Sequence, residues 1–467
     1  MKLVLKFGGT SLASPSDIRN VAKTIASLAK NNEIVVVCSA IDGVTDDLIR
    51  ISTMIEQRNK NDTNKTLDSV IKKHKQFADQ TIKNSTIKKQ LLEKLNADIL
   101  ELQELVRGLT LLKEVSTRSL DYLISFGERL SDDLVSFSLQ ELKKKSTALN
   151  GKEVGIVTDS NFGESRPLMD TTRIRISKTL GSLLSKKIIP VVGGFAGADQ
   201  HGNITTFGRG GSDYTATIIA SCINADEIWL MSDVEGLMTA DPKLVKNAKL
   251  LNEVSYAEAI EMALFGAKQI HPRTFEPILS KKIPMRIRST FDTKNTGTIV
   301  TASPSEKTKK TVKCVSAIRN VSLIDLSGGI TFAAPGTATK IFTTLSEKKV
   351  NVMMVSSNPS ESSLSLIVKK SDLEKAVTTL EMNLLGKTIK KIDATPNVSI
   401  IAVIGSGMKG TVGVASKVFS AAQKANVNVI MIAQGSSELN LAFVVKDVYC
   451  KSVVQALHDE FRLDKLI

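Results

Sequence analysis

The chain has 467 residues and a formal net charge of +14 at pH 7, from 62 Lys and Arg against 48 Asp and Glu. At about 150 residues per domain, this length predicts two to four domains. A hydrophobic content of 42% and a charged content of 24% are ordinary for globular proteins and exclude wholesale disorder. The four cysteines are scattered along the chain, which favours reduced thiols. The first residues, MKLVLKFGG, have too few apolar residues between their lysines for a signal peptide, and no apolar run approaches the roughly 18–20 residues of a membrane span. We therefore expect a cytoplasmic protein without a membrane partner.

Short β-branched runs alternate with amphipathic helical stretches over the first 300 residues. We expect strands at 2–7, 34–39, 188–193, 227–232 and 284–287. We expect helices at 16–29, 46–57, 90–112, 118–143, 171–184 and 213–222. This alternation is typical of an α/β fold with a largely parallel sheet. Residues 301–313, TASPSEKTKKTVK, have the composition of a linker.

Much of the positive charge is concentrated in residues 60–94 and in the short run 307–313. Within the first segment, apolar residues recur at helical spacing between the lysines: Leu67, Val70, Ile71, Phe77, Ile82, Ile87, Leu91, Leu92 and Leu95. Lysines on the outer face of long helices explain this pattern better than a nucleic-acid site, because an aromatic content of 4% supplies few base-stacking side chains. We expect no nucleic-acid partner.

The C-terminal part of the chain contains an internal duplication. Residues 320–368 and 397–445 align without gaps at an offset of 77, and 17 of the 49 positions are identical. Each copy reads as strand, Gly-rich loop, helix, strand, polar turn and strand. This pattern predicts two adjacent ferredoxin-like α+β units.

The second copy contains a motif typical of dinucleotide binding. Gly405, Gly407 and Gly410 spell G-x-G-x-x-G between a predicted strand and a predicted helix. A dinucleotide site also requires an acidic residue about 20 positions further on, but the next strand ends in Ala433 and Gln434. We therefore expect the glycines to shape a loop, not a nicotinamide site.

A first cluster with site chemistry is KFGGTS, residues 6–11, at the end of the opening strand. Lys6 supplies a positive charge, and the backbone N–H groups at Gly8 and Gly9 can approach an anion. The chain has no P-loop motif, and an ordinary turn explains the two glycines equally well.

A second cluster is FGRGGSDYTA, residues 207–216. Arg209 offers a bidentate fork for a carboxylate and, flanked by glycines, has no obvious packing role. Ser212 and Asp213 can contact a ligand or simply cap the following helix.

A third cluster combines MSDVEGLMTADPK, residues 231–243, with GAKQIHPRT, residues 266–274. Ser232, Asp233 and Asp241 have the loop chemistry of a nucleotide site. Lys268 could reach a phosphate, whereas we expect His271 to be structural.

These clusters, with SFGERLS at 125–131, occur in the order found in aspartate kinases of the amino-acid kinase superfamily, which the chain resembles over essentially its whole length. The repeated units resemble the paired ACT domains of that family, and the length resembles its monofunctional form. The resemblance implies a three-layer α/β kinase domain at 1–300, the linker at 301–313, and ACT units at 314–390 and 391–467. It also implies transfer of the ATP γ-phosphate to the β-carboxylate of L-aspartate with Mg²⁺, the first step toward lysine, threonine and methionine.

The resemblance also implies roles for individual residues. Lys6 would neutralise phosphate oxygens and Asp213 would orient the lysine amines, as the catalytic pair. The substrate-binding residues would be Ser39, Thr45, Glu128, Arg209 and Ser212, with Arg209 on the α-carboxylate and Glu128 on the ammonium. The ATP-binding residues would be Lys6, Gly8, Gly9, Ser232, Asp233, Asp241, Lys268 and Gln269. The attacking carboxylate is ionised at pH 7 and needs no general base, and Mg²⁺ would be held by ATP oxygens and water, with no protein ligand assigned.

The ACT pair implies feedback by an amino acid, lysine or threonine, and assembly into a homodimer or dimer of dimers. The candidate effector residues are Ile330 and Gly336, in the preferred loop 330–339, and Gln434. Ser357 occupies the position of Gln434 in the first copy, so the two copies need not bind the effector alike.

Two other functions stay open on the residues alone. One is a different carboxylate or carbamate kinase of the same superfamily, which a swap of aspartate for glutamate would identify. The other is an amino-acid sensor whose kinase domain is inactive, against which the presence of Lys6, Arg209, Asp213 and Lys268 argues.

Overall fold

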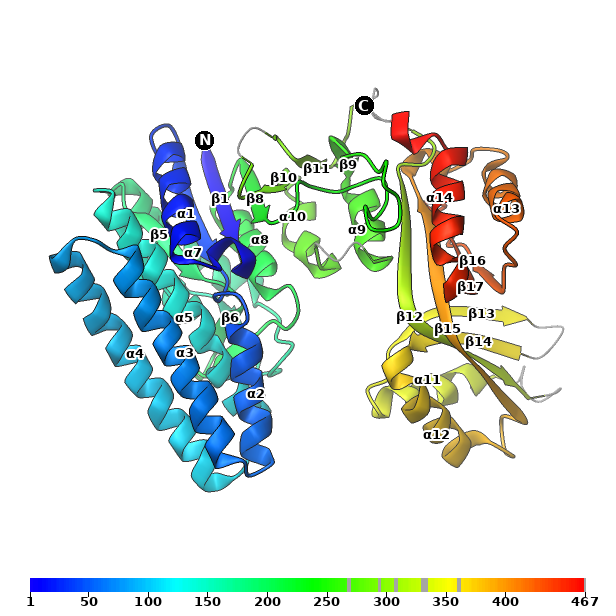
Figure 1. Ribbon diagram of the computed structural model, residues 1–467, viewed down its shortest axis with the longest axis horizontal. Helices are drawn as coiled ribbons and strands as arrows, with labels where there is room; N and C mark the ends of the chain where they lie inside the picture. The colour runs from blue at the N-terminus through cyan, green and yellow to red at the C-terminus, as the bar shows by residue number, and fades with distance from the viewer. Residues whose placement is uncertain (267–269, 293–294, 306–309, 329–334, 359–362, 466–467) are drawn as a thin grey trace. The chain divides into compact units, whose positions relative to one another are not determined.

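The computed structural model describes all residues except 267–269, 293–294, 306–309, 329–334, 359–362 and 466–467 (Figure 1). Its contacts divide the chain into two compact units. The first comprises Met1–Gly236 and Ile270–Ser303, and the second comprises Leu237–Gln269 and Pro304–Ile467. Among the described residues, no helix is long and apolar enough to cross a membrane.

The first unit is built on a largely parallel sheet, as the sequence predicts. Its strands are β1 (Lys2–Phe7), β2 (Glu33–Cys38), β3 (Ser146–Leu149), β5 (Ile189–Gly193), β8 (Glu227–Ser232), β10 (Met285–Ser289) and β11 (Thr298–Thr301). They follow the order β3-β5-β2-β1-β8-β10-β11, and every neighbouring pair is parallel except β10–β11.

Helices cover both faces of this sheet. They are α1 (Pro15–Leu28), α2 (Val44–Glu56), α3 (Lys60–Thr81), α4 (Ser85–Leu112), α5 (Thr117–Glu141), α7 (Met169–Ser185) and α8 (Gly211–Ile223). Leu3, Leu5 and Phe7 of β1 share one core with α1–α5. Val4 and Val37, which alternate with core-facing residues, are buried on the opposite face, where α7 and α8 contact the sheet. The predicted three-layer arrangement is confirmed.

The lysine-rich segment forms two long helices, α3 and α4, and its expected solvated face is confirmed. Leu67, Val70, Phe77, Leu91 and Leu95 are buried in the core of the first unit. The lysines between them are mostly exposed, namely Lys60, Lys65, Lys72, Lys75, Lys83, Lys89 and Lys94.

A second, three-stranded sheet in the first unit has no counterpart among the sequence predictions. It consists of β4 (Val157–Thr158), β6 (Ala196–Asp199) and β7 (Ile204–Thr206) in that order, and follows the short helix α6 (Gly151–Val154). These strands have two to four residues each, too few for hydrophobic alternation to reveal them. The small sheet carries the loop that leads into α8.

The second unit contains the duplicated units, and matched backbone conformations confirm the duplication. The elements of the duplicated region are β12 (Cys314–Ser327), α11 (Thr337–Glu347), β13 (Val352–Asn358), β14 (Ser363–Lys369), α12 (Leu373–Leu384), β15 (Lys391–Ile404), α13 (Val414–Lys424), β16 (Met431–Ala433), β17 (Asn440–Lys446) and α14 (Cys450–Glu460). Asn320 and Asn397 have φ of 60° and 58°, and Gly336 and Gly413 both have φ of 87°. Each of these pairs is 77 residues apart.

The two ACT units exchange strands. The six-stranded sheet has the order β13-β14-β12-β15-β17-β16. Residues 321–327 of β12 pair with β14, whereas 314–318 pair with 400–404 of β15, and a register irregularity near Asn320 separates the two halves. One four-stranded βαββαβ unit therefore spans about 321–397, and the other combines 314–318 with 398–467.

The end of the expected linker is packed inside the second unit. Val312 and Lys313 are buried, at 3% and 2% exposed. A Cβ added to Gly405 would lie 2.3 Å from the carbonyl oxygen of Thr311, and one added to Gly407 would lie 2.5 Å from that of Lys310. Two glycines of the G-x-G-x-x-G motif thus allow a backbone crossing, which agrees with the expectation that they shape a loop.

Candidate active site

The carboxyl ends of the parallel strands meet the N-terminus of α8 around an ion pair. Lys6 lies near the end of β1, Ser39 directly follows β2, and Ser212 and Asp213 lie in the first turn of α8. Lys6 Nζ is 2.6 Å from Asp213 Oδ1, and the two side chains are only 14% and 12% exposed. A helix N-terminus and an ammonium group both favour a bound anion, so this edge can receive phosphate.

The loop after β1 brings backbone close to this ion pair. A Cβ added to Gly9 would lie 2.9 Å from the carbonyl oxygen of Ala40, whereas one on Gly8 would lie 3.5 Å from Lys6 Nζ. The Gly8 N–H donates to the carbonyl of Met231 at 3.3 Å. A phosphate that accepts from Gly8 would have to replace this long hydrogen bond.

Glu128 is buried beside the loop that follows β2. One of its carboxylate oxygens accepts from the Ala40 N–H at 3.3 Å, and Oε2 has no partner among the described residues. Burial raises the pKa of Glu128 to about 8, against smaller lowering effects of the Ala40 N–H and the charge of Lys6. Thr45 is adjacent, since a Cβ added to Gly127 would lie 3.7 Å from its Oγ1. A ligand ammonium here would meet an unpaired carboxyl oxygen and would favour the ionised form of Glu128.

Arg209 stands on a tightly held loop between β7 and α8. Gly208 and Gly210 on either side have φ of 73° and 72°, a region that glycine adopts without strain. The Arg209 side chain is exposed and has no ion-pair partner among the described residues. Its guanidinium is therefore available to a carboxylate.

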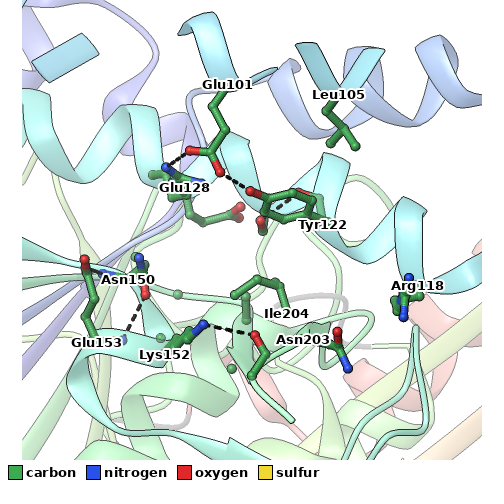
Figure 2. A pocket seen from close by; sticks show the side chains of 18 of the residues that line it. Glu101, Leu105, Arg118, Tyr122, Glu128, Asn150, Lys152, Glu153, Asn203 and Ile204 are labelled. Carbon is green, nitrogen blue, oxygen red and sulfur yellow. Dashed lines mark hydrogen bonds and ion pairs between the residues drawn. The ribbon is translucent and has the colours of Figure 1, made fainter. Parts of the chain in front are cut away.

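A cavity of about 800 Å³ opens beside Glu128. Figure 2 shows Glu128 between Glu101 and Tyr122 on one side and the turn of Asn150 and Glu153 on the other. Glu128, to which the sequence analysis assigned the substrate ammonium, lines this cavity. This volume exceeds that of a single amino acid, so a small polar substrate would have room to enter here.

The expected nucleotide residues lie in different places. Ser232 ends β8, and its hydroxyl donates to the exposed Asp233 at 2.9 Å. Asp241 belongs to the second unit, where its carboxylate accepts from the Lys243 N–H at 2.8 Å. Lys268 and Gln269 lie outside the described residues. Gly8, Gly9, Ser232 and Asp233 are therefore the expected ATP-binding residues that share a described unit with Lys6.

The expected effector residues lie in the second unit. Gly336 precedes α11, and the exposed Gln434 follows β16, so they belong to different ACT copies. Ile330 lies outside the described residues.

Sequence reasoning missed the buried carboxylates of α5 other than Glu128. Asp121 is 1% exposed and Asp132 is 3% exposed. A Cβ added to Gly193 would lie 2.8 Å from Asp132 Oδ2, so that residue must be glycine for the carboxylate to fit. Burial and the neighbouring Asp133 raise the pKa of Asp132. The signal was the spacing of residues 121, 128 and 132, which places three acids on the inner face of one helix.

Comparisons with known proteins agree with this architecture. A model of the amino acid kinase family matches residues 1–289, and a model of the ACT domain matches residues 324–384 and 401–461. The chain therefore belongs to the amino acid kinase family and carries a duplicated ACT domain. The two ACT matches are again 77 residues apart.

The relatives found are aspartate kinases, which confirms the expected resemblance. The chain is 31% identical to the bifunctional aspartokinase/homoserine dehydrogenase 1 of Zea mays, over 99% of this chain and 50% of that protein. It is 30% identical to aspartokinase 2 of Arabidopsis thaliana, over 98% of this chain and 84% of that one. The chain thus spans about half the length of the first of these relatives.

Solved structures show the same fold over nearly the whole chain. E. coli aspartokinase III in complex with aspartate and ADP has a TM-score of 0.82 and 27% identity, covering 98% of this chain and 99% of that one. Clostridium acetobutylicum aspartate kinase has a TM-score of 0.79 and 26% identity, covering 98% and 100%.

Proposed function

We propose that the protein is an aspartate kinase, which transfers the γ-phosphate of ATP to the β-carboxylate of L-aspartate and gives 4-phospho-L-aspartate. The observation that carries the proposal is the largely buried Lys6–Asp213 ion pair at the start of α8, in one unit with Glu128 and the exposed Arg209. The complex of E. coli aspartokinase III with aspartate and ADP supports the choice of substrates. We propose a kinase domain at 1–300, a linker at 301–313 and ACT copies at 314–390 and 391–467. The two ACT limits mark repeats along the chain, whose strands interleave as described above.

The reaction needs alignment and charge neutralisation more than proton transfer. The β-carboxylate attacks as an anion, because an aspartate side chain has an ordinary pKa of about 3.9. Charge then builds on the oxygens of the transferring phosphoryl group, where an ammonium held in advance stabilises it. Lys6 supplies this ammonium, and Asp213 fixes its position.

Magnesium belongs to the proposed nucleotide complex. Mg²⁺ neutralises phosphate charge when it is bound with ATP. The carboxylate closest to the reaction, Asp213, is engaged by Lys6 at 2.6 Å. We propose that ATP oxygens and water supply most ligands of the metal ion, as they usually do for Mg²⁺.

Acyl-phosphate formation tests the proposal directly. The full chain is incubated with MgATP, hydroxylamine and either aspartate or glutamate, and the hydroxamate is measured. Aspartate-dependent hydroxamate supports the proposal. Glutamate-dependent hydroxamate would instead favour another carboxylate kinase, and no hydroxamate from folded protein would favour the sensor.

Arg209→Ala is expected to raise the KM for aspartate about ten- to a hundredfold, with kcat changed by no more than a few-fold. A charged hydrogen bond is worth about 1.5–3 kcal/mol, and about 1.4 kcal/mol corresponds to a factor of ten. The contact is made in ground and transition states alike, so it acts on binding. Initial rates over a range of aspartate concentrations measure both constants. Arg173→Ala, an exposed arginine on α7, is the control and should leave both unchanged.

The KM for aspartate is expected to fall as the pH rises toward 8. Glu128 has a pKa of about 8 in the empty site, and only its ionised form attracts the substrate ammonium. Below pH 8 the ionised fraction rises about tenfold per pH unit, and the apparent affinity follows it. KM for aspartate and for ATP is measured between pH 6 and 8. Glu128→Gln should remove the slope for aspartate, and a slope that persists in this variant would assign the titration to another group.

Regulation and assembly are proposed from the ACT pair. E. coli aspartokinase III has been solved in complex with lysine and aspartate, which supports lysine, with threonine as the alternative, as feedback effector near Ile330, Gly336 and Gln434. We also propose a homodimer or dimer of dimers through the ACT units. A cytoplasmic location is proposed because all four cysteines are free and buried.

A further inference from the structure

Asp121 on α5 forms a buried clamp that the proposed chemistry does not use. Its side chain is 1% exposed and accepts three hydrogen bonds. The N–H groups of Gly163 and Thr206 donate to Oδ2 at 2.9 and 2.8 Å, and the Thr206 hydroxyl donates to Oδ1 at 2.7 Å. One carboxylate thus joins helix α5 to the loop of Gly163 and to the end of β7, from which the loop of Arg209 starts.

The loop fixed by this clamp is the one that carries Arg209. Thr206 is the last residue of β7, three positions before Arg209. The second loop supports the first, because the Ser165 N–H donates to the Thr206 carbonyl at 2.9 Å. A Cβ added to Gly208 would lie 3.0 Å from the carbonyl oxygen of Gly163. Displacing Asp121 would therefore loosen both supports of Arg209.

Arg273 holds the same loop from another direction. Its guanidinium donates to the carbonyls of Phe207 at 3.2 Å and Ser165 at 3.0 Å, and lies 5.0 Å from the centre of the Tyr214 ring. The backbone before Arg209 is thus tied down, while the Arg209 side chain itself is exposed. A fixed backbone with a free guanidinium is preorganised to receive a carboxylate.

We propose that Asp121 is a positioning residue for substrate binding, which acts through Thr206 to place the Arg209 guanidinium where the α-carboxylate of the amino-acid substrate binds. The proposal rests on the proposed function. Asp121 itself contacts no substrate. An error of about 1 Å in such a placement can change a rate by up to about a hundredfold.

Asp121→Ala is expected to raise the KM for aspartate about tenfold or more, with kcat and the KM for ATP within about threefold of wild type. Asp121→Asn should stay close to wild type. Its oxygen can accept both N–H bonds while its amide donates to the Thr206 hydroxyl, which can serve as acceptor. Thr206→Val removes one of the three hydrogen bonds and should raise the KM for aspartate by a smaller factor. This variant replaces Asp121→Ala in the test if Asp121→Ala does not fold.

Glu141→Ala is the matched control, because Glu141 also lies on α5 and its carboxylate also accepts hydrogen bonds from backbone N–H groups of another segment. Its carboxylate accepts from the N–H groups of Lys83 and Asn84 at 2.6 and 2.8 Å, in a turn without an assigned site residue. It should lower the thermal midpoint without changing the KM for aspartate. If Asp121→Ala does the same, Asp121 is a structural residue only and the proposal is wrong.

A double variant tests whether Asp121 acts through Arg209. In an Arg209→Ala background, Asp121→Ala should cause no further loss in kcat/KM for aspartate, whereas independent residues would add their effects. Full additivity would overturn the proposal. If the wild-type protein makes aspartyl phosphate and Asp121→Ala has the same KM for aspartate, this inference is wrong and the proposed function stands. If the wild-type protein is inactive, the proposed function is wrong.

Discussion

Lys6→Ala is expected to lower kcat at least about a hundredfold. Lys6 Nζ is held 2.6 Å from Asp213 in a largely buried position, and removal of one such preorganised donor typically reduces kcat by a factor of about 10²–10³. The loss should fall equally on kcat and kcat/KM, because the ammonium meets the additional phosphoryl charge only in the transition state. Steady-state rates with saturating aspartate and MgATP measure it.

Lys2→Ala is the control for this prediction. Lys2 begins the same strand, but its ammonium donates to the carbonyl of Ile223 at the opposite end of β1. Activity of this variant should stay near wild type, and the thermal midpoints of both variants should show folded protein. If folded Lys6→Ala turns over at a near-normal rate, Lys6 does not neutralise the transferring phosphate and the mechanism above loses its central residue.

The grouping of the candidate site residues at one edge of the sheet could be predicted because they follow strands that the sequence reveals. Lys6 lies next to the last residue of β1, and Ser232 ends β8. Parallel strands place their carboxyl ends at one edge of a sheet. The clamp around Arg209 could not be predicted in this way. It depends on β7, which has three residues, and on the contact of Asp121 with Thr206, 85 positions further along the chain.

The residues that exchange between the ACT units could not be predicted from the sequence either. The duplication identifies two copies of one unit, but hydrophobic alternation does not tell which sheet a strand joins. Residues 314–318 precede the first copy and yet pair with 400–404 in the second. Within this segment, the side chain of Val315 is buried in the hydrophobic core of the second ACT copy. Only long-range pairing, which local pattern does not contain, defines these boundaries.

Glu258→Ala is expected to destabilise the second unit by about 3–5 kcal/mol, because it leaves the buried ammonium of Lys313 unpaired. The two side chains are 0% and 2% exposed, and Lys313 Nζ donates to Glu258 Oε2 at 2.8 Å. Glu258 also accepts from the N–H and hydroxyl of Ser406, at 2.9 and 2.6 Å, and from the N–H of Ser255, at 2.8 Å. The carboxylate of Glu258 therefore joins α9 (Tyr256–Leu264) to Lys313, at the end of the expected linker 301–313, and to Ser406 of the second ACT copy.

The pH dependence of this network has a defined sign. Burial alone would raise the pKa of Glu258, but the hydrogen bonds from Lys313, Ser406 and Ser255 outweigh it and hold the pKa below its ordinary value. A carboxyl whose pKa is lowered by folding stabilises the folded state above the pKa of the unfolded chain, and this contribution is lost as the pH falls through the folded-state value. The destabilisation by Glu258→Ala should accordingly be largest at neutral pH and shrink in acid.

Urea unfolding of the full chain can separate the two units. Trp229, the single tryptophan, lies on β8 of the first unit, so its fluorescence should report a midpoint that Glu258→Ala leaves unchanged. Far-UV circular dichroism, which reports both units, should gain an earlier transition. Glu261→Ala, which removes a single hydrogen bond to Asn440, is the control and should cost about 1 kcal/mol. Adding Lys313→Met to Glu258→Ala should recover part of the loss, because it removes the unpaired ammonium and leaves only the donors of Ser406 and Ser255 without their acceptor. If it does not, or if Glu258→Ala is as mild as the control, the unpaired ammonium is not the cause.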